Sequence, residues 1–103
     1  MKYGIIRTDT ADALIREIIL YIAENFGNSV ALKKLDELEE AILSLGDNPY
    51  IGTTPKYNVL KRQGYMVLIL EKNLVFYKIK EKIVTVYAVL GQIQNYLDII
   101  RGL

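Results

Sequence analysis

The stretch GYMVLILEKNLVFYKI, residues 64–79, runs into IVTVYAVL, residues 83–90, and these two segments decide the fold. They are rich in β-branched and aromatic residues and are interrupted by short polar turns, which is typical of consecutive strands. We therefore expect strands at residues 65–70, 74–79 and 83–90, preceded by another at residues 57–60. Turns this short join antiparallel neighbours, so the second half of the chain predicts a β-meander.

The last of these strands has a regular alternation of side chains. Val84, Val86, Ala88 and Leu90 alternate with Thr85 and Tyr87. Successive side chains of a strand point to opposite faces of the sheet. The pattern therefore predicts that the four apolar residues share one buried face.

The first half of the chain predicts a short strand and two helices. Residues 2–7 suit the strand, and Thr8, Asp9 and Thr10 offer side-chain oxygens that cap a helix start. The first helix is expected to run to about Phe26, because glycine, here Gly27, is common just after a helix end. A second helix should follow, with its apolar face at Ala31, Leu35, Leu38, Ile42 and Leu45.

Turn-forming residues fill the connection at positions 46–55, and residues 93–100 suit a short terminal helix. The expected fold is α+β, with an N-terminal strand and helical hairpin packed on a mostly antiparallel β-meander, followed by the short C-terminal helix. We expect one domain over residues 1–103.

Composition limits the chemistry that this chain can perform. Of its 103 residues, 51% are hydrophobic and 24% are charged, which is usual for a globular domain. It contains no cysteine and no histidine, so disulfides, thiolate metal sites and imidazole catalysis are excluded. The acidic cluster on the second helix, at Asp36, Glu37, Glu39 and Glu40, is interpreted as a solvated face. We expect neither a metal site nor a cofactor.

The charge is distributed unevenly along the chain. Residues 1–50 have a net charge of −4 and residues 51–103 a net charge of +5. A basic half is suited to phosphate or to an acidic partner, although both halves could equally carry solvated charges. We find no pattern of a signal peptide or a spanning helix, so we expect a cytoplasmic protein without membrane contact.

Several short motifs occur in an order that resembles the RelE/ParE toxins of type II toxin-antitoxin systems. The matching residues are Tyr21-Ile22 in the first helix, Leu45-Gly46-Asp47-Asn48-Pro49 after the second, then Gly64-Tyr65, Val75-Phe76-Tyr77, Val84-Thr85-Val86-Tyr87-Ala88-Val89 and Asn95-Tyr96. The resemblance covers nearly the whole chain. It implies a growth-arresting toxin that a cognate antitoxin neutralises, in a toxin-antitoxin hetero-oligomer.

The chain departs from the family pattern at positions that are often basic or histidine. Met66, Ala88, Gly91 and Ile93 stand there instead. An mRNA endonuclease needs groups that orient the ribose, neutralise phosphate and protonate the leaving oxygen. These departures favour a toxin that acts by binding over one that cuts mRNA efficiently.

The residues left for a target-binding or catalytic role are cations and tyrosines. The candidates for contact with RNA or another target are Lys56, Lys61, Arg62, Tyr65, Lys72 and Lys78, and the candidates for catalysis are Lys61, Arg62, Lys78 and Tyr96. Lys61 and Arg62 also suit a simple solvated turn, and Lys78 also suits a strand that resists aggregation. Tyr77 and Tyr87 are interpreted as packing residues.

Three functions are consistent with these observations. The chain is a toxin that binds DNA gyrase, a ribosome-dependent mRNA endoribonuclease, or a non-toxic member that acts only as an antitoxin partner. In each case an antitoxin is implied by the resemblance. Ile15, Ile19 and Phe26 widen the apolar stripe of the first helix beyond one buried face, and we expect the antitoxin to bind there.

Overall fold

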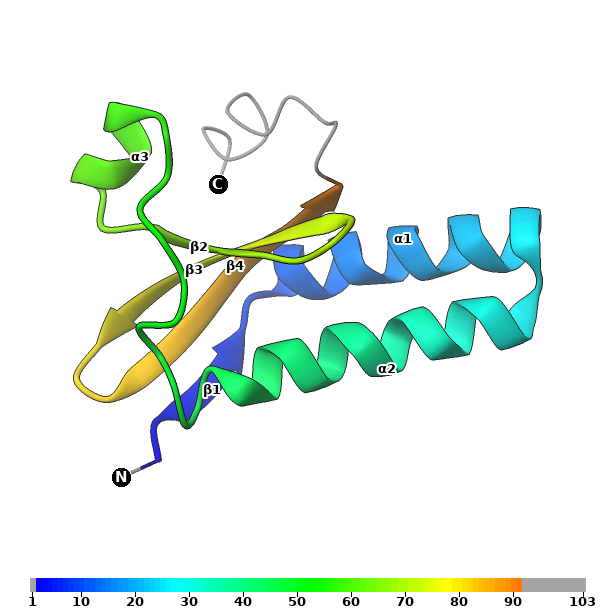
Figure 1. The fold of residues 1–103 in the computed structure, drawn as a ribbon, viewed down its shortest axis with the longest axis horizontal. Coiled ribbons are helices and arrows are strands. Elements are labelled where there is room, and N and C mark those ends of the chain that lie inside the picture. Colours follow the sequence, from blue (N-terminus) through cyan, green and yellow to red (C-terminus); the bar gives the residue numbers. More distant parts are fainter. Residues whose placement is uncertain (1, 92–103) are drawn as a thin grey trace.

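The computed structural model describes residues 2–91 and shows a helical hairpin packed against a twisted sheet (Figure 1). The elements are β1 (Gly4–Arg7), α1 (Asp9–Phe26), α2 (Asn28–Ser44), α3 (Asn58–Arg62), β2 (Met66–Ile69), β3 (Asn73–Lys80) and β4 (Ile83–Gly91). The strands lie in the order β1-β4-β3-β2, with β1 parallel to β4 and the other neighbours antiparallel. The predicted α+β fold is confirmed, while the expected helix at residues 93–100 lies outside the described residues.

Local signals set the bounds of the helical hairpin. The Thr8 side chain accepts a hydrogen bond from the backbone N–H of Ala11, at 3.1 Å, and so caps α1. Gly27 separates α1 from α2 with φ at +97°, a conformation that only glycine adopts without strain. The sharp turn at Gly27 lets α2 return along α1.

The sheet buries apolar side chains on both faces. On one face, Val75, Tyr77, Val84, Val86 and Val89 pack against Ala11, Ile15, Leu38, Ile42 and Leu45 of the hairpin region. On the other face, Leu60, Tyr65, Val67, Leu74, Phe76, Ala88 and Leu90 form a second core beneath α3. The hairpin thus covers one face of the sheet, and α3 and its neighbours cover part of the other.

The expected alternation along the last strand was wrong beyond Val86. Tyr77 pairs with Val86 and Phe76 pairs with Ala88, so Tyr87 is an extra residue in a β-bulge. The bulge turns Val89 toward the hairpin and leaves Ala88 and Leu90 in the second core. Tyr87 is thereby placed on the face away from the hairpin.

Residues 57–60 do not form the expected strand. The Tyr57 carbonyl accepts hydrogen bonds from Leu60 and Lys61, which opens the single turn of α3. The side of β2 that faces away from β3 is already occupied, because Thr53 forms an antiparallel bridge with Val67 there. A helical turn instead lets Leu60 enter the second core, where it is fully buried.

Within residues 2–91, we find no helix that has the length and apolarity needed to cross a membrane.

Candidate functional site

Two adjoining cavities form one groove between the hairpin and the end of the sheet. Their volumes are about 530 and 470 Å³. Ile22, Lys34 and Lys72 line both, so we treat them as one hairpin groove. Its other lining residues include Tyr21, Phe26, Val30, Leu38, Leu70 and Asn73.

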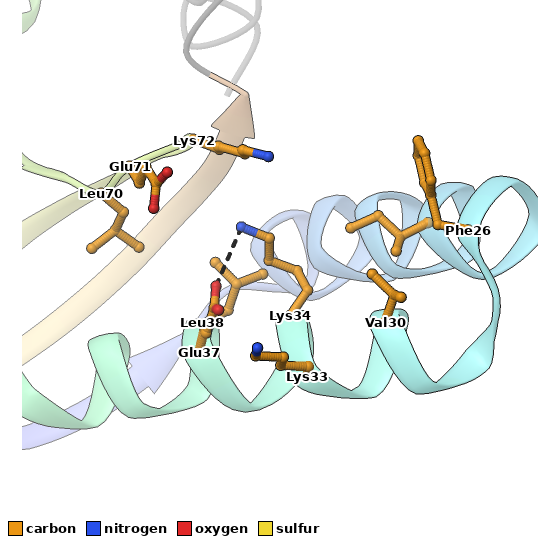
Figure 2. A pocket seen from close by; sticks show the side chains of 10 residues that line it. Phe26, Val30, Lys33, Lys34, Glu37, Leu38, Leu70, Glu71 and Lys72 are labelled. Carbon is orange, nitrogen blue, oxygen red and sulfur yellow. Dashed lines mark ion pairs between the residues drawn. The ribbon is translucent and has the colours of Figure 1, made fainter.

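The two helices, the turn between β2 and β3, the start of β3 and the end of β4 position the side chains of the hairpin groove. The free end of the hairpin extends beyond the sheet (Figure 1), and Ile22, Phe26 and Val30 near that end line the groove. Leu70, Glu71 and Lys72 come from the turn between β2 and β3 and face Lys34 and Leu38 of α2 (Figure 2). The groove therefore combines apolar side chains with charged ones, which are Glu17, Lys33, Lys34, Glu37, Glu71 and Lys72.

The residues predicted to bind an antitoxin lie at different depths. Ile15 is only 6% exposed and belongs to the core, and Ile19 is half-buried against that core. Ile15 is therefore inaccessible to a partner, because α1 directs it at the sheet. Phe26 is 64% exposed and lines the hairpin groove. Of the three, Phe26 offers the accessible contact.

A second candidate surface lies on the opposite face of the sheet. Lys78 Nζ lies 4.5 Å from the ring centroid of Tyr65 and 5.1 Å from that of Tyr87. The two rings meet edge to face, 5.5 Å apart and at 83°. Cation–π contacts of this kind are each worth about 0.5–1 kcal/mol at accessible sites. They hold the Lys78 ammonium in place.

The pKa of the Tyr65 hydroxyl is higher than that of an unperturbed tyrosine. Burial raises the pKa of Tyr65, and the neighbouring Tyr87 raises it further. Burial also raises the pKa of Tyr77, although a hydrogen bond with the Gly52 backbone partly lowers it. At neutral pH the Tyr65 hydroxyl is therefore protonated, and the Tyr65 ring lies against the Lys78 ammonium.

Exposed cations extend this second surface. Lys61 and Arg62 end α3, close in sequence to Tyr65, and both are exposed. We call Lys61, Arg62, Tyr65, Lys78 and Tyr87 the outer-face patch. Lys56 is also exposed, with its Nζ 5.2 Å from the centroid of the Tyr57 ring.

The structure divides the predicted target residues between two sites. Lys72 lines the hairpin groove, whereas Lys78 lies at the far end of β3 and on the other face. Tyr96 lies outside the described residues. Sequence reasoning missed Tyr87 and Lys34. The sequence offered one indication of Tyr87: it is an aromatic residue in the predicted strand at residues 83–90, which was expected to pair with the strand that contains Lys78.

Three of the departures from the family pattern have a structural position. Met66 is half-buried on the hairpin side of β2, Ala88 is buried in the second core, and Gly91 ends β4. Ile93 lies outside the described residues. In the region that the structure describes, no group of three or more acidic residues is placed to hold a metal ion.

Solved structures with a similar fold come from toxin-antitoxin systems and from a protein of unassigned role. The chromosomal ParDE system of P. aeruginosa contains a chain that matches with a TM-score of 0.74 and 19% identity, over 87% of this chain and 96% of that one. The RelBE2 toxin-antitoxin complex of Mycobacterium tuberculosis matches with a TM-score of 0.63 and 15% identity, over 89% and 100%. A conserved hypothetical protein from Helicobacter pylori matches with a TM-score of 0.54 and 17% identity, over 87% and 94%.

A comparison with family models assigns the chain to a protein family, which similarity of fold alone does not do. No curated protein matches the chain significantly. The model of the ParE toxin of the type II toxin-antitoxin system parDE matches residues 5–96. That match spans both candidate surfaces and nearly the whole sequence, and it agrees with the motif order. The chain therefore belongs to the ParE toxin family of type II toxin-antitoxin systems.

Proposed function

We propose that this protein is a cytoplasmic toxin that arrests growth by binding DNA gyrase and is neutralised by a cognate antitoxin. The observation that carries the proposal is the match to the ParE toxin family over residues 5–96. A binding mechanism requires an accessible, complementary surface and no acid–base constellation. The outer-face patch provides such a surface.

The chemistry of the outer-face patch supports binding to an acidic or hydrogen-bond-accepting surface. Lys78, Lys61 and Arg62 supply positive charge, while Tyr65, which is only 6% exposed, supports the Lys78 ammonium through the cation–π contact. A raised tyrosine pKa is unsuited to a general base near neutral pH, because a base must lose its proton readily. Cleavage of mRNA is the alternative, and the half-buried Tyr87 ring favours it in so far as bases stack on aromatic side chains, whereas Tyr65 is only 6% exposed.

The hairpin groove supports the antitoxin part of the proposal. It combines a long apolar lining with exposed Phe26, and such grooves bind amphipathic helices or extended segments. The groove and the outer-face patch lie on opposite sides of the sheet. An antitoxin in the groove is therefore separable by mutation from target binding at the patch.

The direct test uses the purified chain, purified gyrase, ATP and relaxed plasmid. We expect the chain to inhibit supercoiling, and we expect the triple variant Lys61→Ala, Arg62→Ala, Lys78→Ala to lose inhibition while it keeps its thermal stability. A matched triple variant at Lys2, Lys33 and Lys80 removes the same charge elsewhere. Unchanged supercoiling, together with cleavage of a translated message in a cell-free system, would establish the nuclease instead.

A further inference from the structure

Two lysines face one another across the hairpin groove. Lys34 comes from α2 and Lys72 from the turn between β2 and β3, and both line both cavities. Figure 2 shows their ammonium groups directed into the same gap. Lys33 of α2 also lines the groove, as do the carboxylates of Glu17, Glu37 and Glu71.

Lys34 is held in this position by the protein itself. Its Nζ donates a 2.9 Å hydrogen bond to Oδ1 of Asn73, which is buried at the start of β3. Glu37 Oε2 lies 3.5 Å from the same Nζ, but the Glu37 side chain is 57% exposed. The Lys34 side chain is only 18% exposed. The structure thus fixes one ammonium at the wall of the groove, with a solvent-exposed carboxylate as its ionic partner.

Filling the groove changes the energetics of these two cations. Apolar residues lie on either side of them, with Phe26, Val30 and Leu70 toward one end and Ile18, Tyr21 and Val89 toward the other. A segment that covers those residues also removes water from Lys34 and Lys72. Desolvating an ammonium group is unfavourable unless an opposite charge compensates for it. An ammonium has three donors, so an incoming carboxylate can bond to Lys34 while Asn73 remains bound.

We propose that the segment occupying the groove carries one carboxylate side chain, placed between Lys34 and Lys72, with apolar side chains before and after it. This inference rests on the proposed assignment of the groove to the antitoxin. Lys34 and Lys72 are then specificity determinants. A segment with a neutral or basic residue at that point leaves Lys72 desolvated without a new carboxylate and Lys34 with only Glu37 as its ionic partner, so its binding is disfavoured.

The test is selection of peptides from a phage-displayed random library on the purified, immobilised chain. Parallel selections use the double variant Lys34→Met, Lys72→Met and a control variant, Lys80→Met, which removes a lysine at the far end of β3. Circular dichroism and thermal melts confirm that each variant is folded. Loss of binding in the Phe26→Asp variant locates the selected peptides in the groove.

We expect the wild-type chain and the Lys80→Met control to select apolar peptides that share one acidic residue. The double variant should select apolar peptides without it. Changing that acidic residue to its amide should weaken binding to the wild-type chain by about 30-fold or more, and binding to the double variant hardly at all. Equal acidic content in all selections, or no groove-binding peptide, would overturn the inference. The gyrase assay is independent of the groove, so failure of the inference and failure of the proposed target are distinguished.

Discussion

The hydroxyl of Tyr77 donates a 2.8 Å hydrogen bond to the carbonyl oxygen of Pro49. The same hydroxyl accepts a 3.1 Å hydrogen bond from the backbone N–H of Gly52. Tyr77 is fully buried in the middle of the sheet, so its side chain ties β3 to the connection between α2 and α3. That connection leads through the Thr53–Val67 bridge to α3 and the outer-face patch.

Replacing Tyr77 by Phe should therefore destabilise the protein. The variant leaves the Pro49 carbonyl without a donor and the Gly52 N–H without an acceptor, at a cost of about 2 kcal/mol. Urea unfolding followed by circular dichroism measures the change. The matched control is Tyr21→Phe, because Tyr21 is exposed and its loss of a hydroxyl should change the free energy of unfolding little. Equal effects of the two variants would contradict a structural role for the Tyr77 hydroxyl.

Gly52 should tolerate no side chain. A Cβ atom there would lie 2.7 Å from the Val67 carbonyl oxygen and would also overlap the Tyr77 hydroxyl. We expect Gly52→Ala to lower stability by about 1–3 kcal/mol, as overpacking of a dense interior does. Gly4→Ala is the control, since its Cβ would meet only the Ile83 side chain at 3.8 Å. A thermal melt in which both variants resemble the wild type would rule out the close approach at Gly52.

The raised tyrosine pKa values predict how stability depends on pH. Burial raises the pKa of Tyr65 and Tyr77 above the value of 10.0 for an unperturbed tyrosine. The folded state therefore binds these protons more tightly than the unfolded state. Their contribution to stability is complete below pH 10 and is lost as the pH rises through the folded-state values. Urea midpoints between pH 9 and 12 should fall steeply, and less steeply in Tyr65→Phe. An identical slope in that variant would be the contrary result.

Phe26 should matter for the antitoxin and not for the fold. It is exposed, so Phe26→Asp should change the free energy of unfolding by less than about 0.5 kcal/mol. A charge in the hairpin groove should nevertheless weaken binding of the antitoxin, measured as reduced rescue of growth when both proteins are expressed. Leu43→Asp is a matched control, because Leu43 is exposed on α2 and is not among the residues that line the groove. Full rescue of growth with the Phe26→Asp variant would show that the antitoxin does not bind in the hairpin groove.

Much of the fold was predictable because its signals are local. Thr8 and Gly27 mark helix ends, and the β-branched runs at residues 65–70, 74–79 and 83–90 mark the meander. The predictions were wrong where the structure depends on pairing between strands that are distant in sequence. The bulge at Tyr87 depends on its register with β3, and residues 58–60 belong to α3 since the β2 edge is occupied by Thr53.

The candidate sites were less predictable than the fold. Lys61, Arg62, Tyr65 and Lys78 were singled out as charged or aromatic residues in a basic half, and the structure brings Tyr65 and Lys78 into contact. Helical periodicity alone did not show that Ile15 faces the core and Phe26 the groove. The Lys34–Asn73 contact joins residues 39 apart in sequence, and no local pattern reports such a contact.

The most direct test of the proposed function is induced expression of the chain in bacteria that lack the antitoxin, with incorporation of labelled thymidine and labelled amino acid followed separately. We expect DNA synthesis to fail first, and we expect the Lys61, Arg62, Lys78 triple alanine variant to restore it. Protein synthesis failing first would contradict gyrase as the target and favour mRNA cleavage. Continued synthesis of both would show that the chain is not toxic.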